Sequence, residues 1–299
     1  MQKPIYFSII VPTYNRADLI VNTLKSLQNQ EYKNYEIIVV DDGSNDNTTE
    51  VVKNIADERI TYVKKTNGER AAARNFGAAI AKGDYVNFFD SDDIALPHHL
   101  SESVKIINQN NFPEWVYVAY ALADSKRNII QAQNKFVGKT INNQMVRGNV
   151  LGCNSVFVRR DIFLLHKFNE DRVLSASEDY ELWCRLTARY PLYYSNLISS
   201  LIIQHDQRSV NTITGAQLIN RISALKKYLK QDKEVVKYFG KNFSKIEMHL
   251  FGYISLHLSE YRAFKTRSLF YLSKSIAMNP VFITKRMFYA IIRNIFFRW

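Results

Sequence analysis

Apolar, β-branched segments alternate with helical patterns through the first third of the chain, and this alternation narrows the folds that are open to it. Almost every residue of these segments is apolar, which is typical of strands buried on both faces. Such strands, separated by helices, indicate a mainly parallel sheet with helices on both sides. We expect strands at Phe7–Val11, Glu36–Val40, Ile60–Val63 and Tyr85–Phe89, and helices at Asp18–Asn29, Thr48–Ala56 and Arg70–Ala81.

Polar residues follow three of these strands. Thr13–Asn15 come after the first strand, Asp41–Gly43 after the second and Asp90–Asp93 after the fourth. Ligands bind beyond the carboxyl ends of strands in such sheets, so these residues should line one binding site. Carboxylates two residues apart, as Asp90 and Asp92 are, can converge on a divalent cation, although the same residues also suit a solvated turn.

The rest of the chain is less regular. We expect strands at Trp115–Ala123, Asn149–Arg159 and Leu197–Ile203, a helix at Glu178–Arg189, and only helices from Ile222 onward. Cys153 and Cys184 have no metal-ligand spacing, so we expect both to be buried thiols in a reducing compartment. The start of the sequence has no signal-peptide pattern, and no stretch approaches the ~18 apolar residues of a membrane span, which predicts a cytoplasmic protein.

The positive charge is concentrated in the last quarter of the sequence. Arg221–Trp299 contain 16 lysines and arginines against four aspartates and glutamates, whereas residues 1–220 hold 24 of each kind. The whole net charge of +12 therefore belongs to this segment. We expect a main domain over residues 1–220 and a basic helical region over 221–299 that has an anionic partner.

Four segments carry a resemblance to a known family. They are Ser8–Arg16 (SIIVPTYNR), Val39–Thr48 (VVDDGSNDNT), Ala73–Asp93 (ARNFGAAIAKGDYVNFFDSDD) and Ser177–Leu186 (SEDYELWCRL). In this order and spacing they resemble the inverting family 2 glycosyltransferases of bacterial polysaccharide assembly, which have the GT-A fold. The resemblance covers roughly Ser8 to Ser209. It implies a nucleotide-sugar half at about residues 1–95 and an acceptor half at about 96–220.

The resemblance implies a nucleotide pocket around Asp42, which would accept a hydrogen bond from N3–H of the donor's base. Thr13 and Tyr14 would line the same pocket. Arg70 and Arg74 begin a helix, where anions bind readily, and one of them would reach the base or the diphosphate. The alternatives are an ordinary Asp-Gly-Ser turn at Asp42 and solvated cations on the helix surface.

A divalent metal, manganese or magnesium, is the implied cofactor. Asp92 would bind it, Asp93 would complete its shell, and Asp90 would orient the ribose or the sugar. His205 matches the position where this fold often places a histidine on the metal from a late loop, although a lone histidine is usually structural.

Glu178 and Asp179 resemble the family's acidic pair at the start of a helix. Asp179 would be the catalytic base that takes the proton of the acceptor hydroxyl during attack. The alternative is a carboxylate that complements the helix dipole. Asn154 would contact the sugar, and Arg208 would meet a phosphate of the donor or acceptor.

The C-terminal segment 280–299 is amphipathic. Pro280 suits the first turn of a helix that could run from Val281 to Trp299. Its basic residues would then face away from its apolar ones, which are Phe288, Ile291, Ile292, Ile295 and Trp299. This pattern predicts a helix that lies on an anionic membrane surface, or else one that packs on the catalytic domain with its cations in water.

The sequence therefore predicts a cytoplasmic enzyme, associated with the inner face of the membrane, that transfers a sugar from a nucleotide donor. A uridine diphosphate sugar is the expected donor, and a polyprenyl-linked glycan is the expected acceptor. A basic nucleic-acid-binding protein and a catalytically inactive relative remain as alternatives; salt-sensitive oligonucleotide binding would identify the first. A dinucleotide oxidoreductase is disfavoured, because Pro12–Asn15 replace the glycine-rich turn that it needs.

Overall fold

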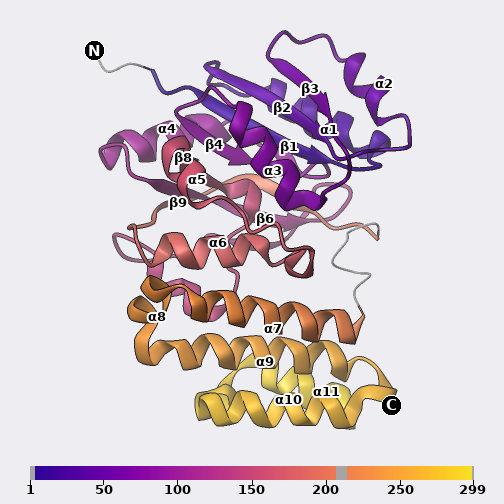
Figure 1. The fold of residues 1–299 in the computed structure, drawn as a ribbon, viewed down its shortest axis with the longest axis vertical. Coiled ribbons are helices and arrows are strands. Elements are labelled where there is room, and N and C mark those ends of the chain that lie inside the picture. Colours follow the sequence, from indigo (N-terminus) through magenta and orange to yellow (C-terminus); the bar gives the residue numbers. More distant parts are fainter. Residues whose placement is uncertain (1–3, 207–213, 298–299) are drawn as a thin grey trace.

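The computed structural model describes residues 4–206 and 214–297. They form one nine-stranded sheet with helices on both faces, followed by a stack of C-terminal helices (Figure 1). The strands are β1 (Phe7–Thr13), β2 (Tyr35–Asp41), β3 (Ile60–Lys64), β4 (Tyr85–Phe88), β5 (Ile94–Ala95), β6 (Trp115–Ala123), β7 (Ile129–Gln133), β8 (Val156–Arg159) and β9 (Tyr193–Ile203). The α-helices are α1 (Ala17–Gln28), α2 (Thr48–Lys53), α3 (Glu69–Ile80), α4 (His99–Gln109), α5 (Arg160–His166), α6 (Glu178–Thr187), α7 (Gly215–Gln231), α8 (Lys233–Phe239), α9 (Phe243–Ser259), α10 (Lys265–Met278) and α11 (Arg286–Phe296).

The sheet has the order β3-β2-β1-β4-β8-β6-β9-β5, with β7 paired to β6. β1 runs parallel to β2 and β4, and β2 runs parallel to β3. β8 is antiparallel to both β4 and β6, so it joins the first half of the sheet to the second. The mainly parallel sheet with flanking helices confirms the predicted fold class. It also places the carboxyl ends of β1, β2 and β4 at one edge of the sheet. The polar residues that follow these strands can therefore line one site.

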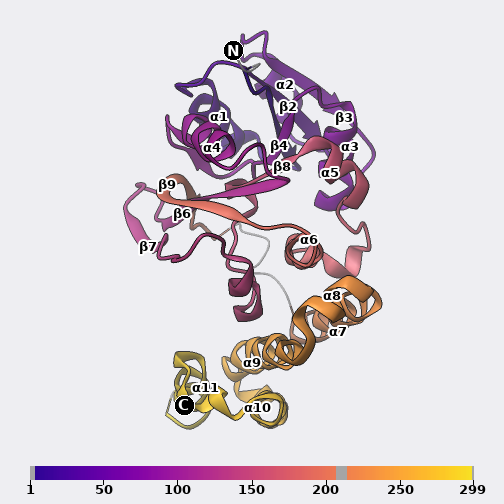
Figure 2. The same cartoon turned by 90° about the vertical axis from the view of Figure 1, so that its left-hand side faces the viewer.

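Separate sets of helices cover the two faces of the sheet (Figure 2). Apolar residues of α1 and α4 pack on one face, and those of α3, α5 and α6 pack on the other. α3 lies very close to β1, because a Cβ atom added at Gly77 would be 2.5 Å from Cγ2 of Ile10. This close approach sets the position of α3 relative to β1.

The strand expected at Asn149–Arg159 is only partly present. Residues 153–155 form the short 3₁₀ helix η2 (Cys153–Ser155), and extended β structure begins at Val156. The turn is closed by a hydrogen bond from Ser155 N–H to Gly152 O (3.0 Å), and it buries the Asn154 side chain. An apolar sequence pattern does not reveal such a turn. Cys153 and Cys184 are buried free thiols, as predicted.

Helices α7, α8 and α9 share a hydrophobic core with the sheet and α6. Leu218, Leu225 and Leu229 of α7 and Ile246 of α9 belong to the same buried cluster as Trp183 of α6. Figure 2 shows α7, α9 and α10 stacked in succession away from the sheet. The boundary expected at residues 220 and 221 falls inside α7, and the division into two domains stays a prediction.

The single helix expected from Val281 to Trp299 is not formed. The chain instead makes a 3₁₀ helix, η7 (Pro280–Thr284), is extended at Lys285, and then enters α11. The Asn279 side chain caps η7 by accepting from Val281 N–H (3.1 Å), and Phe282 of η7 is fully buried. Trp299 lies outside the described residues.

The apolar face of α11 packs inside the protein. Ile291 and Ile295 are buried with Met248 of α9 and Leu272 of α10. Aromatic side chains elsewhere on the helix and just after it remain exposed: Tyr289 by 63%, Phe296 by 59% and Phe297 by 79%. Within the described residues, no helix is both long and apolar enough to cross a membrane.

Candidate active site

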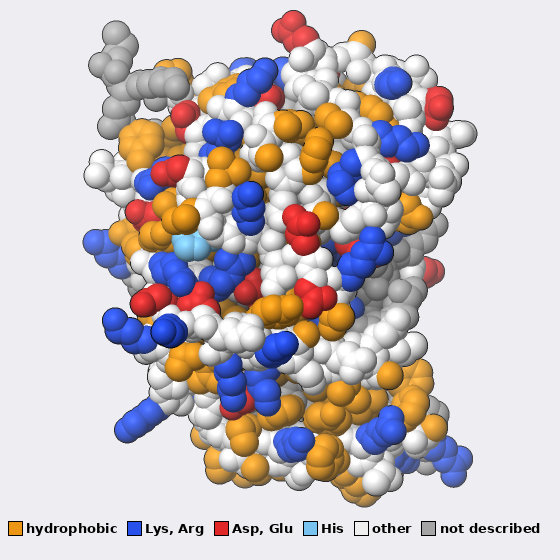
Figure 3. All heavy atoms as spheres, viewed as in Figure 1, with side chains coloured by type: hydrophobic (Ala, Val, Ile, Leu, Met, Phe, Trp, Pro, Cys, Tyr) orange, Lys and Arg blue, Asp and Glu red, His pale blue; other side chains and the backbone are white. Residues whose placement is uncertain are grey.

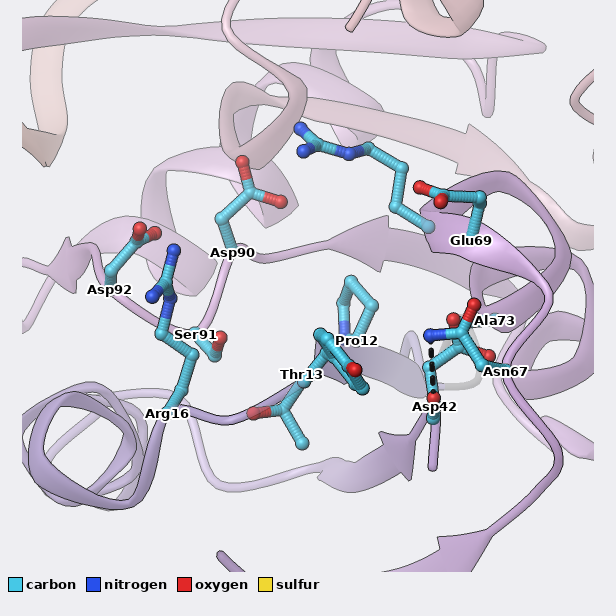
Figure 4. A pocket seen from close by; sticks show the side chains of 12 residues that line it. Pro12, Thr13, Arg16, Asp42, Asn67, Glu69, Ala73, Asp90, Ser91 and Asp92 are labelled. Carbon is cyan, nitrogen blue, oxygen red and sulfur yellow. Dashed lines mark hydrogen bonds between the residues drawn. The ribbon is translucent and has the colours of Figure 1, made fainter. Parts of the chain in front are cut away.

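A cavity of about 260 Å³ lies at the carboxyl ends of β1, β2 and β4 (Figure 4). Six of the residues that the sequence proposes for the site line it, namely Thr13, Tyr14, Asp42, Arg70, Asp90 and Asp92. Four polar residues that the sequence did not single out line it too, namely Arg16, Asn67, Glu69 and Ser91. Arg16 ends the first family-like segment, so its position in that segment could have identified it.

Asp42 is buried at the end of β2, and its contacts fix it in place. Its Oδ1 accepts from Lys65 Nζ (2.7 Å) and from Gly68 N–H (2.9 Å). Its backbone carbonyl accepts from Asn67 Nδ2 (3.0 Å), the bond drawn in Figure 4. Asp42 therefore organises the loop before α3, and its carboxylate still lines the cavity where it can accept from a ligand.

The turn after β1 is held against the loop after β2. Asn15 has φ of 51°, and its backbone N–H donates to Ser44 Oγ (2.9 Å). Asn tolerates this left-handed conformation better than most residues do. The turn leaves Tyr14 half exposed over the cavity. The buried hydroxyl of Thr13 has no hydrogen-bond partner among the described residues, so it is available to a ligand.

Arg74 is a buried bridge between the two halves of the site. Its Nη1 donates to Glu178 Oε1 (2.7 Å) and its Nη2 donates to Asp90 Oδ1 (2.7 Å). Arg74 is 2% exposed and is absent from the cavity lining, whereas Arg70, one turn earlier, lines the cavity. The two arginines thus hold different places. Arg70 is positioned to contact a ligand, and Arg74 positions two carboxylates.

Asp92 and His205 meet at one side of the cavity. His205 Nε2 lies 3.1 Å from Asp92 Oδ2, and both side chains are less than a fifth exposed. Figure 4 shows Asp90, Asp92 and Arg16 pointing into the same part of the cavity. A carboxylate suits both manganese and magnesium, whereas an imidazole favours a transition metal, so this pair fits manganese better than magnesium.

Asp93 is bonded to other groups. Its Oδ1 accepts from Ile203 N–H (3.0 Å), and its Oδ2 accepts from Asn154 Nδ2 (3.2 Å). Asp93 and Asn154 are both 2% exposed and outside the cavity lining, so their geometry favours a structural role for each. Within residues 4–206 and 214–297, no three His, Cys, Asp or Glu side chains are arranged to hold a metal ion. A metal at Asp92 and His205 would therefore need oxygens from a bound ligand.

Asp179 lies at the start of α6 beside Glu178. Its Oδ2 accepts from Asn149 Nδ2 (2.8 Å), and its Oδ1 accepts from Tyr180 N–H (2.7 Å). Burial and the neighbouring Glu178 carboxylate raise the pKa of Asp179 to about 6, although Arg74 acts in the opposite direction. A carboxylate with this pKa is ionised at neutral pH and is more basic than an ordinary aspartate.

Arg221 of α7 also interacts electrostatically with this group, and no local pattern in the sequence singled it out. Burial lowers the pKa of its guanidinium, while Tyr253, Glu178 and Asp179 act to raise it. The C-terminal helices therefore supply a half-buried cation next to the two carboxylates. Arg208 lies outside the described residues.

Comparisons with known proteins agree with this arrangement. The model of the family "Glycosyl transferase family 2" matches residues 8–165. A UDP-Glc:alpha-D-GlcNAc-diphosphoundecaprenol beta-1,3-glucosyltransferase of Escherichia coli is 29% identical, over 82% of this chain and 96% of its own. An uncharacterized glycosyltransferase of Rickettsia bellii is 30% identical over 64% of this chain, but the match spans only 29% of that longer protein.

Solved structures show the same fold at low sequence identity. S. aureus TarS in complex with UDP aligns over 97% of this chain and 88% of its own, with a TM-score of 0.64 and 19% identity. The mannosyltransferase PcManGT from Pyrobaculum calidifontis, in complex with GDP-Man and Mn²⁺, aligns over 99% of this chain and 89% of its own, with a TM-score of 0.61 and 17% identity.

Replacing Arg74 tests its role as a bridge. Arg74→Met should lower the free energy of unfolding by about 3–5 kcal/mol, because it leaves the buried Glu178 carboxylate without its counter-charge. Arg70→Met is the matched control. The Arg70 side chain is 29% exposed and its Nε lies 4.0 Å from Glu178 Oε1, so the loss of unfolding free energy should stay within about 1 kcal/mol. Urea unfolding of both variants measures the difference, and equal losses would contradict the assignment.

Proposed function

The chain belongs to glycosyl transferase family 2, and on this basis we propose that it is an inverting, metal-dependent enzyme. It transfers a sugar from a nucleoside diphosphate donor, most simply a uridine diphosphate sugar, to a hydroxyl group of a glycan acceptor. We place this reaction in the assembly of a surface polysaccharide on a lipid carrier. The observation that carries the proposal is the cavity that gathers Asp42, Asp90, Asp92 and Arg70, together with the Arg74 bridge that links Asp90 to Glu178, the neighbour of Asp179 in the chain.

The donor would lie along the strand ends. Asp42 would accept from N3–H of the base, next to the unpaired hydroxyl of Thr13 and the ring of Tyr14. Arg70 would meet the diphosphate at the start of α3. Asp92 and His205 would hold a divalent ion, which would neutralise the charge on the departing diphosphate.

The acceptor would approach from the side of α6. Asp179 takes the proton from the attacking hydroxyl as the bond from that oxygen to the anomeric carbon forms and the bond to the diphosphate breaks. One base and one displacement invert the configuration at this carbon. Asn149 and the backbone N–H of Tyr180 hold the Asp179 carboxylate, and Arg221 contributes a positive charge that acts on it.

The names of the relatives support the proposed donor, acceptor and metal by analogy. The E. coli relative is named for a UDP-glucose donor and a diphosphoundecaprenol-linked acceptor. TarS was solved with UDP, and PcManGT with GDP-Man and Mn²⁺. The acidic residues around the cavity also make it a poor site for nucleic acid, since they repel phosphate in the absence of a cation.

Removal of the metal tests the proposed cofactor. Transfer should stop in excess chelator and return with manganese or magnesium. Asp92→Ala should lower turnover by at least about 10², because the leaving diphosphate then loses its counter-charge. Asp18→Ala, at the start of α1 and away from the cavity, is the control. Full activity in chelator would remove the metal from the mechanism.

Asp179→Asn separates chemistry from donor binding. Turnover should fall by roughly 10² or more, with donor affinity close to that of the wild type, because only the general base is lost. In the wild type, kcat/KM should fall about tenfold per pH unit below about pH 6, since protonation of Asp179 removes the base. Rates that stay constant down to pH 4.5, or a variant that loses donor affinity but keeps its turnover, would contradict this role.

We further propose that the C-terminal helices rest on the cytoplasmic face of an anionic membrane. The buried face of α11 does not support this contact, but exposed Tyr289, Phe296 and Phe297 do, together with exposed Arg286 and Arg293. Figure 3 shows apolar side chains gathered over the C-terminal end of the molecule, with lysines and arginines among them. Aromatic and basic groups on one surface are typical of interfacial binding.

Vesicle binding tests this contact. The full chain should bind vesicles that contain anionic lipid, and binding should weaken as salt screens the charges. Phe296→Ala with Phe297→Ala should weaken binding about tenfold or more, because each phenyl ring contributes roughly 1.5–3 kcal/mol when it leaves water. The control is Val137→Ala with Leu165→Ala. These two residues are also exposed and apolar, but they are far from α11 in the sequence. Equal vesicle binding by both double variants would contradict the proposal.

A further inference from the structure

A second cavity, of about 710 Å³, lies between the catalytic part and the C-terminal helices. The 3₁₀ helix η1 (Asn142–Arg147) forms one wall, and residues of α8, α9 and η7 form the others. It has no lining residue in common with the donor cavity. The sugar-transfer scheme above does not use it.

The walls of this cavity are basic. Arg147, Lys245 and Lys285 line it together with His249, and no Asp or Glu is among the lining residues. Over the described part of the chain, none of these three cations forms an ion pair with an acidic side chain. Like charges repel when they share one site, so the arrangement favours an anion that neutralises them.

The pKa of His249 is affected by burial and by the positive charges of this cavity. Burial, followed by the charges of Lys285 and Arg147, lowers the pKa of His249 to about 4. The imidazole is therefore neutral near pH 7, and one of its ring nitrogens can donate a hydrogen bond. Amide groups of Asn143 and Asn279 add further donors. Several cations with neutral donors around them form a typical phosphate site.

Two segments connect the cavity to the catalytic base. Arg147 is two residues before Asn149, whose amide donates to Asp179 Oδ2 (2.8 Å). On α9, His249 is one turn before Tyr253, about 6 Å along the helix axis. Tyr253 in turn acts on Arg221, which faces Asp179. The walls of the cavity are therefore connected, through Asn149 and Arg221, to the surroundings of Asp179.

We propose that this cavity binds the phosphate or diphosphate group of the acceptor, and so presents the neighbouring sugar hydroxyl to Asp179. The inference rests on the proposed function and adds the class of acceptor. The group recognised is an anionic phosphate ester, whether a lipid or a soluble molecule carries it. Arg147, Lys245 and Lys285 are all exposed to water, and a neutral glycan would displace that water without neutralising their charges.

The first experiment measures binding of inorganic diphosphate to the full chain by calorimetry. Chelator is present, so that no metal draws the probe to Asp92. Lys245→Gln with Lys285→Gln should weaken the affinity about tenfold or more, and the binding of the wild type should fall as salt rises. Lys237→Gln with Lys241→Gln removes the same charge from exposed lysines outside the cavity, and it should stay within about twofold of the wild type. Equal affinity in both double variants would overturn the proposal.

The second experiment compares acceptors. In Lys245→Gln with Lys285→Gln, the KM for a diphosphate-linked acceptor sugar should rise about tenfold, whereas the KM for a neutral glycoside of the same sugar should not change. An equal rise for both acceptors would contradict phosphate recognition. A variant that loses binding to anionic vesicles but keeps its affinity for diphosphate would assign the cavity to membrane headgroups instead. If diphosphate binds in the cavity but no sugar is transferred, the proposed function fails and the anion site remains.

Discussion

The guanidinium of Arg74 lies between two carboxylates that come from opposite sides of the active site. Asp90 follows β4, and Glu178 begins α6, 104 residues later in the chain than Arg74. A buried cation that satisfies both acids links the two sides, because removal of any partner leaves a charge without compensation in the interior. The positions of Asp90 and of Asp179, next to Glu178, both depend on this link.

Helices α7, α8 and α9 extend this organisation, because they share a hydrophobic core with α6 and the sheet. One apolar cluster runs from the sheet through α6 into α7, α8 and α9. Arg221 consequently acts electrostatically on Glu178 and Asp179, and η1 and α9 line a basic cavity. Part of the excess positive charge therefore lies around this cavity and near Glu178 and Asp179.

Much of the fold was predictable because its strands are buried on both faces, and continuous apolar runs are a strong local signal. The strand ends also identified Asp42, Asp90 and Asp92, since parallel topology brings those ends to one edge. The places of Asp93 and Asn154 were not predictable, because they depend on a hydrogen bond between residues 61 positions apart. The sequence also could not show what covers α11, because its amphipathic pattern fits a membrane surface and a neighbouring helix equally well. Its buried face is explained by Met248 and Leu272, which only the tertiary structure brings next to it.

The central claim is that one base, Asp179, drives a single displacement at the anomeric carbon of a nucleotide sugar. The most direct measurement is proton NMR of the product formed from an α-linked UDP-sugar and an acceptor glycan, with the wild type and Asp179→Asn side by side. The account predicts a β-linked product from the wild type and a yield lower by about two orders of magnitude from the variant. An α-linked product, or equal yields from the two proteins, would contradict it.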